Sequence, residues 1–139
     1  MNNDLNRAII LDNYQNPANK GIPDTDDYIK INTNNESCID NLDIYLKLQD
    51  DIIKDIKFEG EACVISISST SIMTKLLIGK TKKEALEIIN NYKNMISEKP
   101  YNCTLLKEAN VYNEIYKQPS RQKCATLSVS GIEKILKED

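Results

Sequence analysis

Apolar and polar residues alternate without interruption between residues 42 and 48. Aliphatic residues occupy every even position there, and Asp, Tyr and Lys occupy the odd ones, which is the two-residue period of a strand with one buried face. Residues 49–51 can turn the chain, and segment 52–59 then predicts a partner strand with Ile56 and Phe58 facing inward. The pattern therefore predicts two neighbouring strands, each with one face in the core.

A third, shorter strand is expected at residues 28–31. The run that follows it, residues 32–36, consists only of Asn, Thr and Glu, and we expect it to form a turn or an exposed lip because such polar residues are poor candidates for a core. Extending the alternation backward from Leu42 places Cys38 and Asp40 on the core-facing side. An isolated carboxylate is costly to bury, so Asp40 needs a partner there, and a cation would supply one.

Helical periodicity accounts for most of the remaining chain. Segment 63–78 is ambiguous, since its alternation and β-branched residues fit a strand, but its length and the closing Gly79 favour a helix. Thr81 and Glu84 have the spacing of a capping box, which marks the start of another helix. Helices are expected at residues 4–14, 63–78, 81–99, 104–116 and from residue 119 onward. We therefore predict a single α+β domain over residues 1–139, with about three strands and four to six helices.

Composition narrows the classes of function. Of the 139 residues, 40% are hydrophobic, which is enough for one core. The formal net charge of −3 argues weakly against nucleic acid as the main partner. No apolar run approaches the ~20 residues that cross a bilayer, and the polar first residues do not resemble a signal peptide, so a cytoplasmic protein without membrane contact is expected. Histidine is absent, which excludes Ser-His and Cys-His catalytic pairs within this chain.

Candidate chemistry is concentrated in a few residues. Cys38 and Asp40 are two positions apart, so on an extended backbone they project from the same side and could supply half of a tetrahedral metal site. Cys63 and Cys124 lie where helices are expected to begin, and the positive end of a helix dipole there would lower a thiol pKa and favour the thiolate. The spacing matches no compact zinc motif such as Cys-x-x-Cys, so structural burial of these cysteines is an equal alternative. Cys103 has no partner motif and is interpreted as an incidental thiol.

Three segments resemble the iron–sulfur cluster scaffold family. Residues 9–19 (IILDNYQNPAN) are similar to its opening signature, and residues 58–66 (FEGEACVIS) and 121–128 (RQKCATLS) are similar to its second and third cysteine blocks. The resemblance covers nearly the whole chain, and the blocks occur in the family's order. The long segment between Cys63 and Cys124, and the absence of histidine before Cys124, are similar to the SufU branch rather than the histidine-bearing IscU branch.

The resemblance implies a ligand set and a reaction. SufU-type proteins bind zinc through three cysteines and one aspartate, which here correspond to Cys38, Asp40, Cys63 and Cys124. The cysteine matching Cys38 takes persulfide sulfur from a PLP-dependent cysteine desulfurase and passes it toward downstream iron–sulfur cluster assembly. The arginine matching Arg121 is associated with the encounter with the desulfurase. The implied fold is a small antiparallel sheet with helices packed against it.

The sequence departs from the family at three positions. Ile39 and Ala62 replace glycines beside the first and second cysteines, and Asn13 replaces a common histidine, which we interpret as surface or packing variation. Isoleucine is stiff and disfavours positive φ, so Ile39 opposes easy movement of Cys38. Two alternative functions stay open: a scaffold on which the same ligands build a [2Fe–2S] cluster, and an interaction module in which zinc only stabilises the fold.

Overall fold

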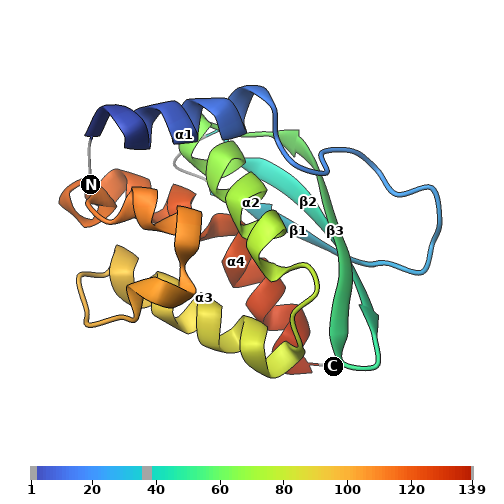
Figure 1. Cartoon of the computed structure of the whole chain (residues 1–139). Helices are drawn as coiled ribbons and strands as arrows, with labels where there is room; N and C mark the ends of the chain where they lie inside the picture. The colour runs from blue at the N-terminus through green and yellow to red at the C-terminus, as the bar shows by residue number, and fades with distance from the viewer. Residues whose placement is uncertain (1–2, 36–38, 139) are drawn as a thin grey trace.

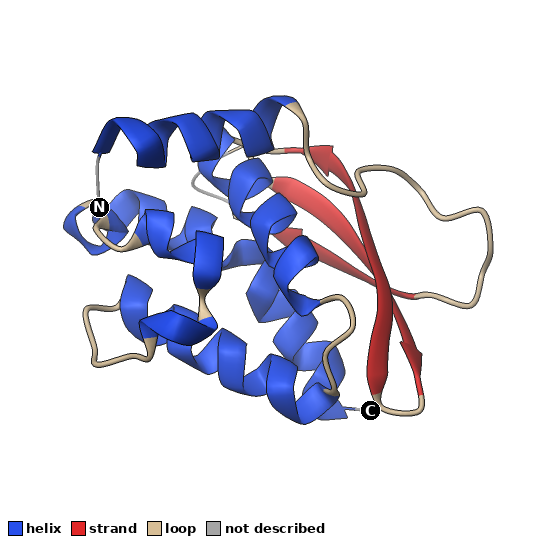
Figure 2. Ribbon diagram, viewed as in Figure 1, coloured by secondary structure: helices blue, strands red, loops and turns tan. Residues whose placement is uncertain are grey.

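The computed structural model describes residues 3–35 and 39–138 (Figure 1). Its sheet is antiparallel, in the order β1 (Ile29–Asn34), β2 (Asn41–Gln49) and β3 (Ile52–Glu61). Helices cover one side of this sheet (Figure 2), and they are α1 (Asn3–Gln15), α2 (Val64–Leu77), α3 (Lys82–Ile96) and α4 (Pro119–Glu138). The predicted α+β class and antiparallel sheet are therefore confirmed, as is the helical reading of the ambiguous segment that begins at Cys63.

The buried face of the sheet has the parity that the alternation predicts. Leu42 and Ile44 on β2 are fully buried, as are Ile56 and Phe58 on β3. α2 and α4 pack against the sheet, and α1 and α3 lie on the outer side of these two helices (Figure 1). Each fully buried side chain of this size contributes about 1.5–3 kcal/mol, so a slip of one residue would be costly and the register is strongly specified. The same parity buries Asp40, one residue before β2.

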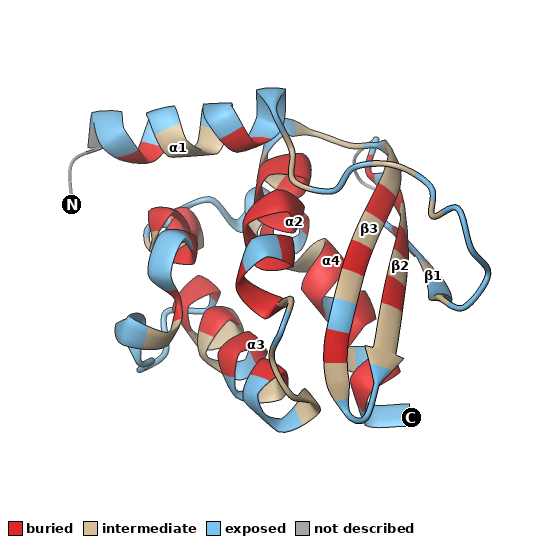
Figure 3. Ribbon diagram, turned by 45° about the vertical axis from the view of Figure 1, so that its right-hand side comes forward, coloured by how far each residue is buried: buried red, intermediate tan, exposed pale blue. Residues whose placement is uncertain are grey.

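α2 is buried around most of its circumference (Figure 3). Its Ser and Thr side chains are small enough for neighbouring helices to approach, and several of their hydroxyls pair with the helix itself, as where Thr70 Oγ1 donates to Ser66 O at 2.6 Å. Ser71 Oγ donates to Asn13 Oδ1 of α1 at 2.8 Å. Asn13 is buried, so this residue, where the family commonly has histidine, has a packing role.

The start of α3 is the predicted capping box. The Thr81 hydroxyl accepts from the Glu84 backbone N–H at 3.1 Å, and the Glu84 carboxylate accepts from the Thr81 N–H at 3.0 Å. These two bonds satisfy donors that would otherwise be unpaired at a helix N-terminus. α4 likewise begins at the predicted residue, Pro119. None of the helices in the described part of the chain is both long enough and apolar enough to cross a membrane.

The prediction of one continuous helix over residues 104–116 is wrong. The segment instead forms three short 3-10 helices, η1 (Cys103–Leu105), η2 (Lys107–Tyr112) and η3 (Ile115–Lys117). A continuous helix is interrupted at Lys107, whose φ of 46° lies in the left-handed region. The Asn110 side-chain amide donates to the carbonyls of Cys103 at 2.8 Å and Lys107 at 2.9 Å. Such side-chain bonds offer the backbone an alternative to the helical ladder.

The expectation of an exposed lip at residues 32–36 is also wrong for its described part. β1 continues to Asn34, and Thr33 and Asn35 are both buried. The Thr33 hydroxyl donates to the Leu42 carbonyl at 3.1 Å, which satisfies a polar group inside the protein. The Asn35 amide points to Cys124 on α4. Polar residues are therefore buried here because each has a hydrogen-bond partner in another element of the fold.

The β2–β3 hairpin turns through Asp50 and Asp51, both at positive φ (54° and 62°), as a two-residue type I′ loop requires. We expect Asp51→Gly to be more stable than Asp51→Ala by about 1 kcal/mol, because glycine adopts this backbone without a Cβ penalty. Both variants lose the exposed ion pair with Lys82 (3.6 Å), so urea denaturation of the two isolates the backbone term. A more stable alanine variant, as is usual at negative φ, would contradict this account.

Because two tyrosines are buried, we expect the free energy of unfolding to decrease at alkaline pH. Burial raises the pKa of Tyr92 and of Tyr112 well above 10, and their hydroxyls pair with Ala125 O at 2.7 Å and Ser68 Oγ at 2.5 Å. Above about pH 10 the unfolded chain ionises these groups first, so stability that is complete below that pH falls by up to about 1.4 kcal/mol per pH unit for each tyrosine. Unfolding free energies of Tyr112→Phe between pH 9.5 and 11 are expected to fall less steeply than those of the unmodified protein. Parallel pH profiles would show that Tyr112 does not contribute.

Candidate metal centre

Asp40 is a buried carboxylate held by two donors. Its side chain is 2% exposed. Oδ1 accepts from the Cys63 backbone N–H at 2.8 Å, and Oδ2 accepts from the Ser66 hydroxyl at 2.5 Å. Burial raises the pKa of Asp40, but the hydrogen bonds from Ser66 and Cys63 outweigh burial and leave the pKa below its usual value. The site therefore contains a carboxylate that is ionised at neutral pH.

Cys63 is positioned by the turn between β3 and α2. It is the N-cap of α2, as its expected place at a helix start requires. Gly60 has a φ of 137°, and a Cβ built there would lie 2.2 Å from the Asn41 carbonyl oxygen, so the close approach of β3 to β2 requires glycine. The Cys63 sulfur is half-buried and lies 3.9 Å from Asp40 Oδ2.

Cys124 comes to the same place from α4. The residue is 1% exposed, and the Asn35 amide nitrogen lies 3.8 Å from its sulfur. Because α4 begins at Pro119, Cys124 lies in the second turn rather than at the helix end. Burial raises the pKa of the Cys124 thiol to about 12, and Asp40 and Cys63 add to the rise.

The expected lowering of the Cys124 pKa by the helix dipole is therefore wrong for the metal-free protein. The dipole effect is confined to about the first turn, and Cys124 lies beyond it. Burial next to a carboxylate and a second thiol dominates instead. A bound cation would reverse this balance, because it deprotonates a coordinating thiol.

Three of the four predicted ligands converge. One ligand atom each from Asp40, Cys63 and Cys124 lies within 4.8 Å of the others. Ligand atoms around a tetrahedral zinc ion are separated by about 3.5–3.8 Å, so small side-chain rotations would bring all three into bonding range. The influences on the Asp40 pKa are burial and neutral donors rather than a basic side chain. The residues thus fit a cation that binds both sulfur and oxygen ligands.

The remaining candidate residues, Cys38, Arg121 and Cys103, are not part of this three-residue group. Cys38 lies outside the described residues, between the buried Asn35 and Ile39, whose side chain is 70% exposed. Arg121 is exposed in the first turn of α4, three residues before Cys124 and therefore on a similar side of the helix. Cys103 is exposed in η1 and does not belong to the three-residue group.

Sequence reasoning missed two residues of the site, Ser66 and Asn35. Ser66 Oγ donates to Asp40 Oδ2 and also lies 3.2 Å from the Cys124 carbonyl oxygen, so it connects α2, α4 and the start of β2. Its position three residues after Cys63 was a usable signal, because residues three apart in a helix share a face. No local pattern could have identified Asn35, which reaches Cys124 only through the folded chain.

We expect Ser66→Ala to lower zinc affinity by about 10–100-fold, the usual cost of removing an outer hydrogen-bond partner of a metal ligand. The change leaves Asp40 Oδ2 without its 2.5 Å donor. Chelator competition would measure the affinity. Ser69→Ala is the matched control, because Ser69 is equally buried on α2 and its hydroxyl donates to the Ser66 carbonyl rather than to Asp40. Equal affinities of the two variants would show that the Ser66 hydroxyl does not orient Asp40.

The model of the NifU-like N-terminal domain family matches residues 5–125. The chain is 39% identical over 137 residues to a Bacillus subtilis protein described as zinc-dependent sulfurtransferase SufU, covering 97% of this chain and 92% of that protein. It is 34% identical over 137 residues to an iron–sulfur cluster assembly scaffold protein IscU of Streptococcus pyogenes, covering 97% and 84%.

A solved structure has the same fold. The crystal structure of a putative iron–sulfur cluster assembly scaffold protein for the SUF system, from Fervidobacterium islandicum, superposes with a TM-score of 0.81 at 33% identity, covering 92% of this chain and 93% of that one. The relatives agree with the chain in length, fold and sequence over nearly its full extent. This chain therefore belongs to the NifU-like N-terminal domain family of SufU- and IscU-type iron–sulfur cluster assembly proteins.

Proposed function

We propose that this protein is a zinc-dependent sulfur carrier that accepts persulfide sulfur from a PLP-dependent cysteine desulfurase for iron–sulfur cluster assembly. The observation that carries the proposal is the convergence of Asp40, Cys63 and Cys124 within 4.8 Å of one another. The similarity to a relative described as a zinc-dependent sulfurtransferase supports zinc and sulfur transfer together.

Cys38 is proposed as the fourth ligand and as the sulfur acceptor. Zinc supplies a way to hold thiolates without oxidising them, since it has no redox chemistry. Asp40 is fixed by the Cys63 N–H and the Ser66 hydroxyl, so the carboxylate is oriented before any metal binds. An oxygen ligand matches this borderline-soft ion less well than sulfur does, which makes the set more labile than four thiolates.

The transfer step needs no external oxidant or reductant. The Cys38 thiolate attacks the outer sulfur of the partner's persulfide, forming a new sulfur–sulfur bond as the partner's breaks. The partner's cysteine leaves as a thiolate, and Cys38 becomes the persulfide. The partner's persulfide is reduced to a thiolate as the Cys38 thiolate is oxidised to the persulfide, so the two-electron change on one protein offsets that on the other.

The surface beside the centre suits a protein partner. A hollow of about 460 Å³ adjoins it, lined by Tyr14, Lys20, Ile39, Glu61 and Ala62 among others. Ile39 and Tyr14 are large apolar side chains with substantial exposure, and exposed apolar groups rimmed by polar ones are typical of interaction sites. We propose that the desulfurase contacts this rim and Arg121, so that Cys38 meets the persulfide.

Desulfurase turnover tests the proposal. Adding the zinc-loaded protein to a SufS-type cysteine desulfurase is expected to raise alanine release from cysteine. Intact mass spectrometry is expected to show one added sulfur atom on this chain and, after peptide mapping, on Cys38. Unchanged turnover together with an unmodified chain would contradict the sulfur-carrier function and would favour a module that zinc only stabilises.

A cluster scaffold is the second candidate, favoured by the 34% identity to the Streptococcus pyogenes protein described as an assembly scaffold. The same thiolates and carboxylate could hold a [2Fe–2S] cluster. Anaerobic purification separates the two functions, because colourless protein with about one zinc per chain supports the carrier, and brown protein containing iron and sulfide supports the scaffold.

A further inference from the structure

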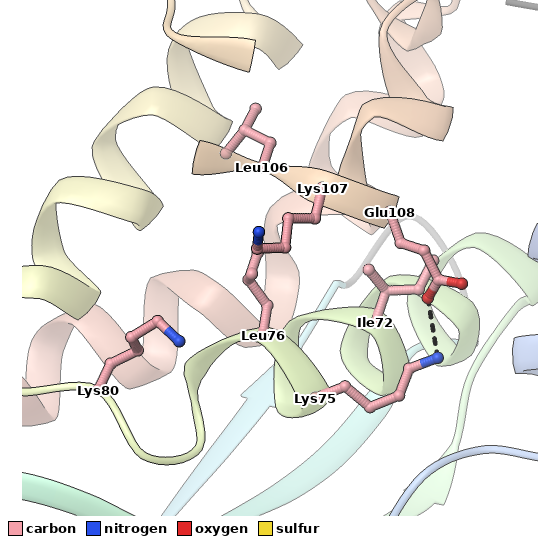
Figure 4. Close-up of a pocket in the computed structure, with 7 residues that line it drawn as sticks. All are labelled: Ile72, Lys75, Leu76, Lys80, Leu106, Lys107 and Glu108. Carbon is pink, nitrogen blue, oxygen red and sulfur yellow. Dashed lines mark hydrogen bonds and ion pairs between the residues drawn. The ribbon is translucent and has the colours of Figure 1, made fainter. Parts of the chain in front are cut away.

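A second hollow, of about 330 Å³, is lined by residues at the C-terminal end of α2 (Figure 4). The metal centre lies at the N-terminal end of the same helix, at Cys63. With a rise of ~1.5 Å per residue, Leu76 lies roughly 20 Å along the helix axis from Cys63. The hollow is lined by Ile72, Lys75, Leu76, Lys80, Leu106, Lys107 and Glu108. It shares no residue with the metal centre, so any role it has is separate from holding the ion.

The hollow combines an apolar floor with a cationic rim. Leu76 and Leu106 contribute the floor, and the Lys80 and Lys107 side chains reach toward it from different walls (Figure 4). Lys75 is paired with Glu108 at 2.8 Å. Within the described chain, no carboxylate forms an ion pair with Lys80 or Lys107. Glu84 attracts Lys80 electrostatically without forming an ion pair with it, and Glu108 is engaged by Lys75. Three lysines and one carboxylate therefore line the hollow, whose charge is net positive in a chain with a net charge of −3.

The backbone conformation at Lys107 directs its side chain toward the hollow. Its φ of 46° is uncommon for a residue with a Cβ, because this left-handed backbone brings the Cβ close to the following carbonyl oxygen. The turn sends Leu106 fully into the core and Lys107, the next residue, out over the hollow. Two hydrogen bonds from the Asn110 amide hold the segment in this form. The wall is therefore ordered before any ligand binds, which lowers the entropic cost of docking.

The size and openness of the hollow decide what can occupy it. A small free ligand needs about 70–90% of its surface buried, in a cavity of about 300–1,000 Å³. This hollow is near the lower end of that range and its floor side chains are already largely covered, so it offers little apolar surface to a free cofactor. It can seat one large apolar side chain whose remaining binding surface comes from a larger partner. The two rim lysines, Lys80 and Lys107, favour carboxylates on either side of the partner's apolar side chain.

We propose that this hollow docks an acidic segment of a partner protein, with one large apolar side chain over Leu76 and Leu106 and flanking carboxylates on Lys80 and Lys107. The site lies away from the metal centre and does not depend on the function proposed above. It would let a partner remain bound at one end of α2 while the metal centre at the other end stays accessible.

Amide NMR shifts of the zinc-loaded protein test the proposal with a capped peptide of sequence Glu-Glu-Phe-Glu-Glu. Shift changes are expected to cluster at Leu76, Lys80 and Lys107. The double variant Lys80→Glu/Lys107→Glu is expected to weaken binding at least tenfold. Lys54→Glu/Lys134→Glu, which changes the net charge equally at exposed residues elsewhere, is expected to change it less than twofold.

The peptide Glu-Glu-Ser-Glu-Glu separates specific docking from simple charge attraction. It is expected to bind at least tenfold more weakly, because it lacks the apolar anchor. Equal binding of the two peptides, an equal loss in both lysine variants, or shifts scattered over the surface would overturn the proposal. The absence of any shift at millimolar peptide would overturn it as well. None of these outcomes depends on metal content or on desulfurase turnover, so this test can fail without contradicting the proposed sulfur-carrier function.

Discussion

Asp40→Ala is expected to abolish tight zinc binding. The change removes the single oxygen ligand of the proposed set and leaves the Cys63 N–H without its acceptor. The Ser66 hydroxyl keeps only its 3.2 Å contact with the Cys124 carbonyl. Affinity should fall by more than the ~10–100-fold that losing an outer-shell partner costs. Each buried donor left unpaired costs about 1–3 kcal/mol, so the metal-free variant should also be less stable. Chelator competition and urea denaturation measure the two effects separately.

Asp43→Ala is the matched control. Asp43 lies three residues away on β2, on the outward side of the strand, and its carboxylate pairs with Lys30 at 3.8 Å. Its removal is expected to cost less than 1 kcal/mol, as for other exposed ion pairs, and to leave zinc affinity unchanged. If Asp40→Ala protein still contained about one zinc per chain with unchanged affinity, the carboxylate would not be a ligand.

Cys38→Ser is expected to reduce sulfur acceptance to the background of the desulfurase alone. A serine hydroxyl has nearly the shape of the thiol but does not form the nucleophile that attacks a persulfide. The fold should survive, because Asp40, Cys63 and Cys124 are unaltered. Desulfurase turnover, together with the added sulfur mass on this chain, would measure the loss.

Cys103→Ser provides the comparison, because Cys103 is an exposed thiol in η1 outside the converging group. This variant should accept sulfur as the unmodified protein does. Full transfer by Cys38→Ser and loss of transfer in Cys103→Ser would reassign the acceptor to the surface thiol.

The regular elements could be predicted because their signals are local. The period of two in β2 placed Leu42 and Ile44 in the core, and by extension it correctly buried Asp40. The capping box at Thr81 identified the start of α3 to the residue. The convergence of Cys63 and Cys124, 61 positions apart in numbering, was not visible in spacing. It was expected only through resemblance to a family.

Two of the errors originate in contacts between distant segments, and a third originates in local side-chain hydrogen bonds. Asn35 is buried because it meets Cys124 on α4, which its polar neighbours in sequence did not indicate. The pKa of Cys124 is raised because burial, the Asp40 carboxylate and the Cys63 thiol outweigh a helix dipole. The break at Lys107 depends on side-chain bonds from Asn110, which compete with the helix. Each outcome depends on specific side-chain partners, which residue propensities along the sequence do not reveal.

Zinc-edge X-ray absorption of the purified protein is the sharpest test of the proposed ligand set, because it counts the atoms bound to the metal. We expect about three sulfur ligands near 2.3 Å and one oxygen near 2.0–2.2 Å. We also expect the Cys124→Ser protein to lose one zinc-bound sulfur, and the Cys103→Ser protein to keep the same number of sulfur ligands as the unmodified protein. A shell of four sulfurs, or one made only of oxygen and nitrogen, would contradict the proposed site.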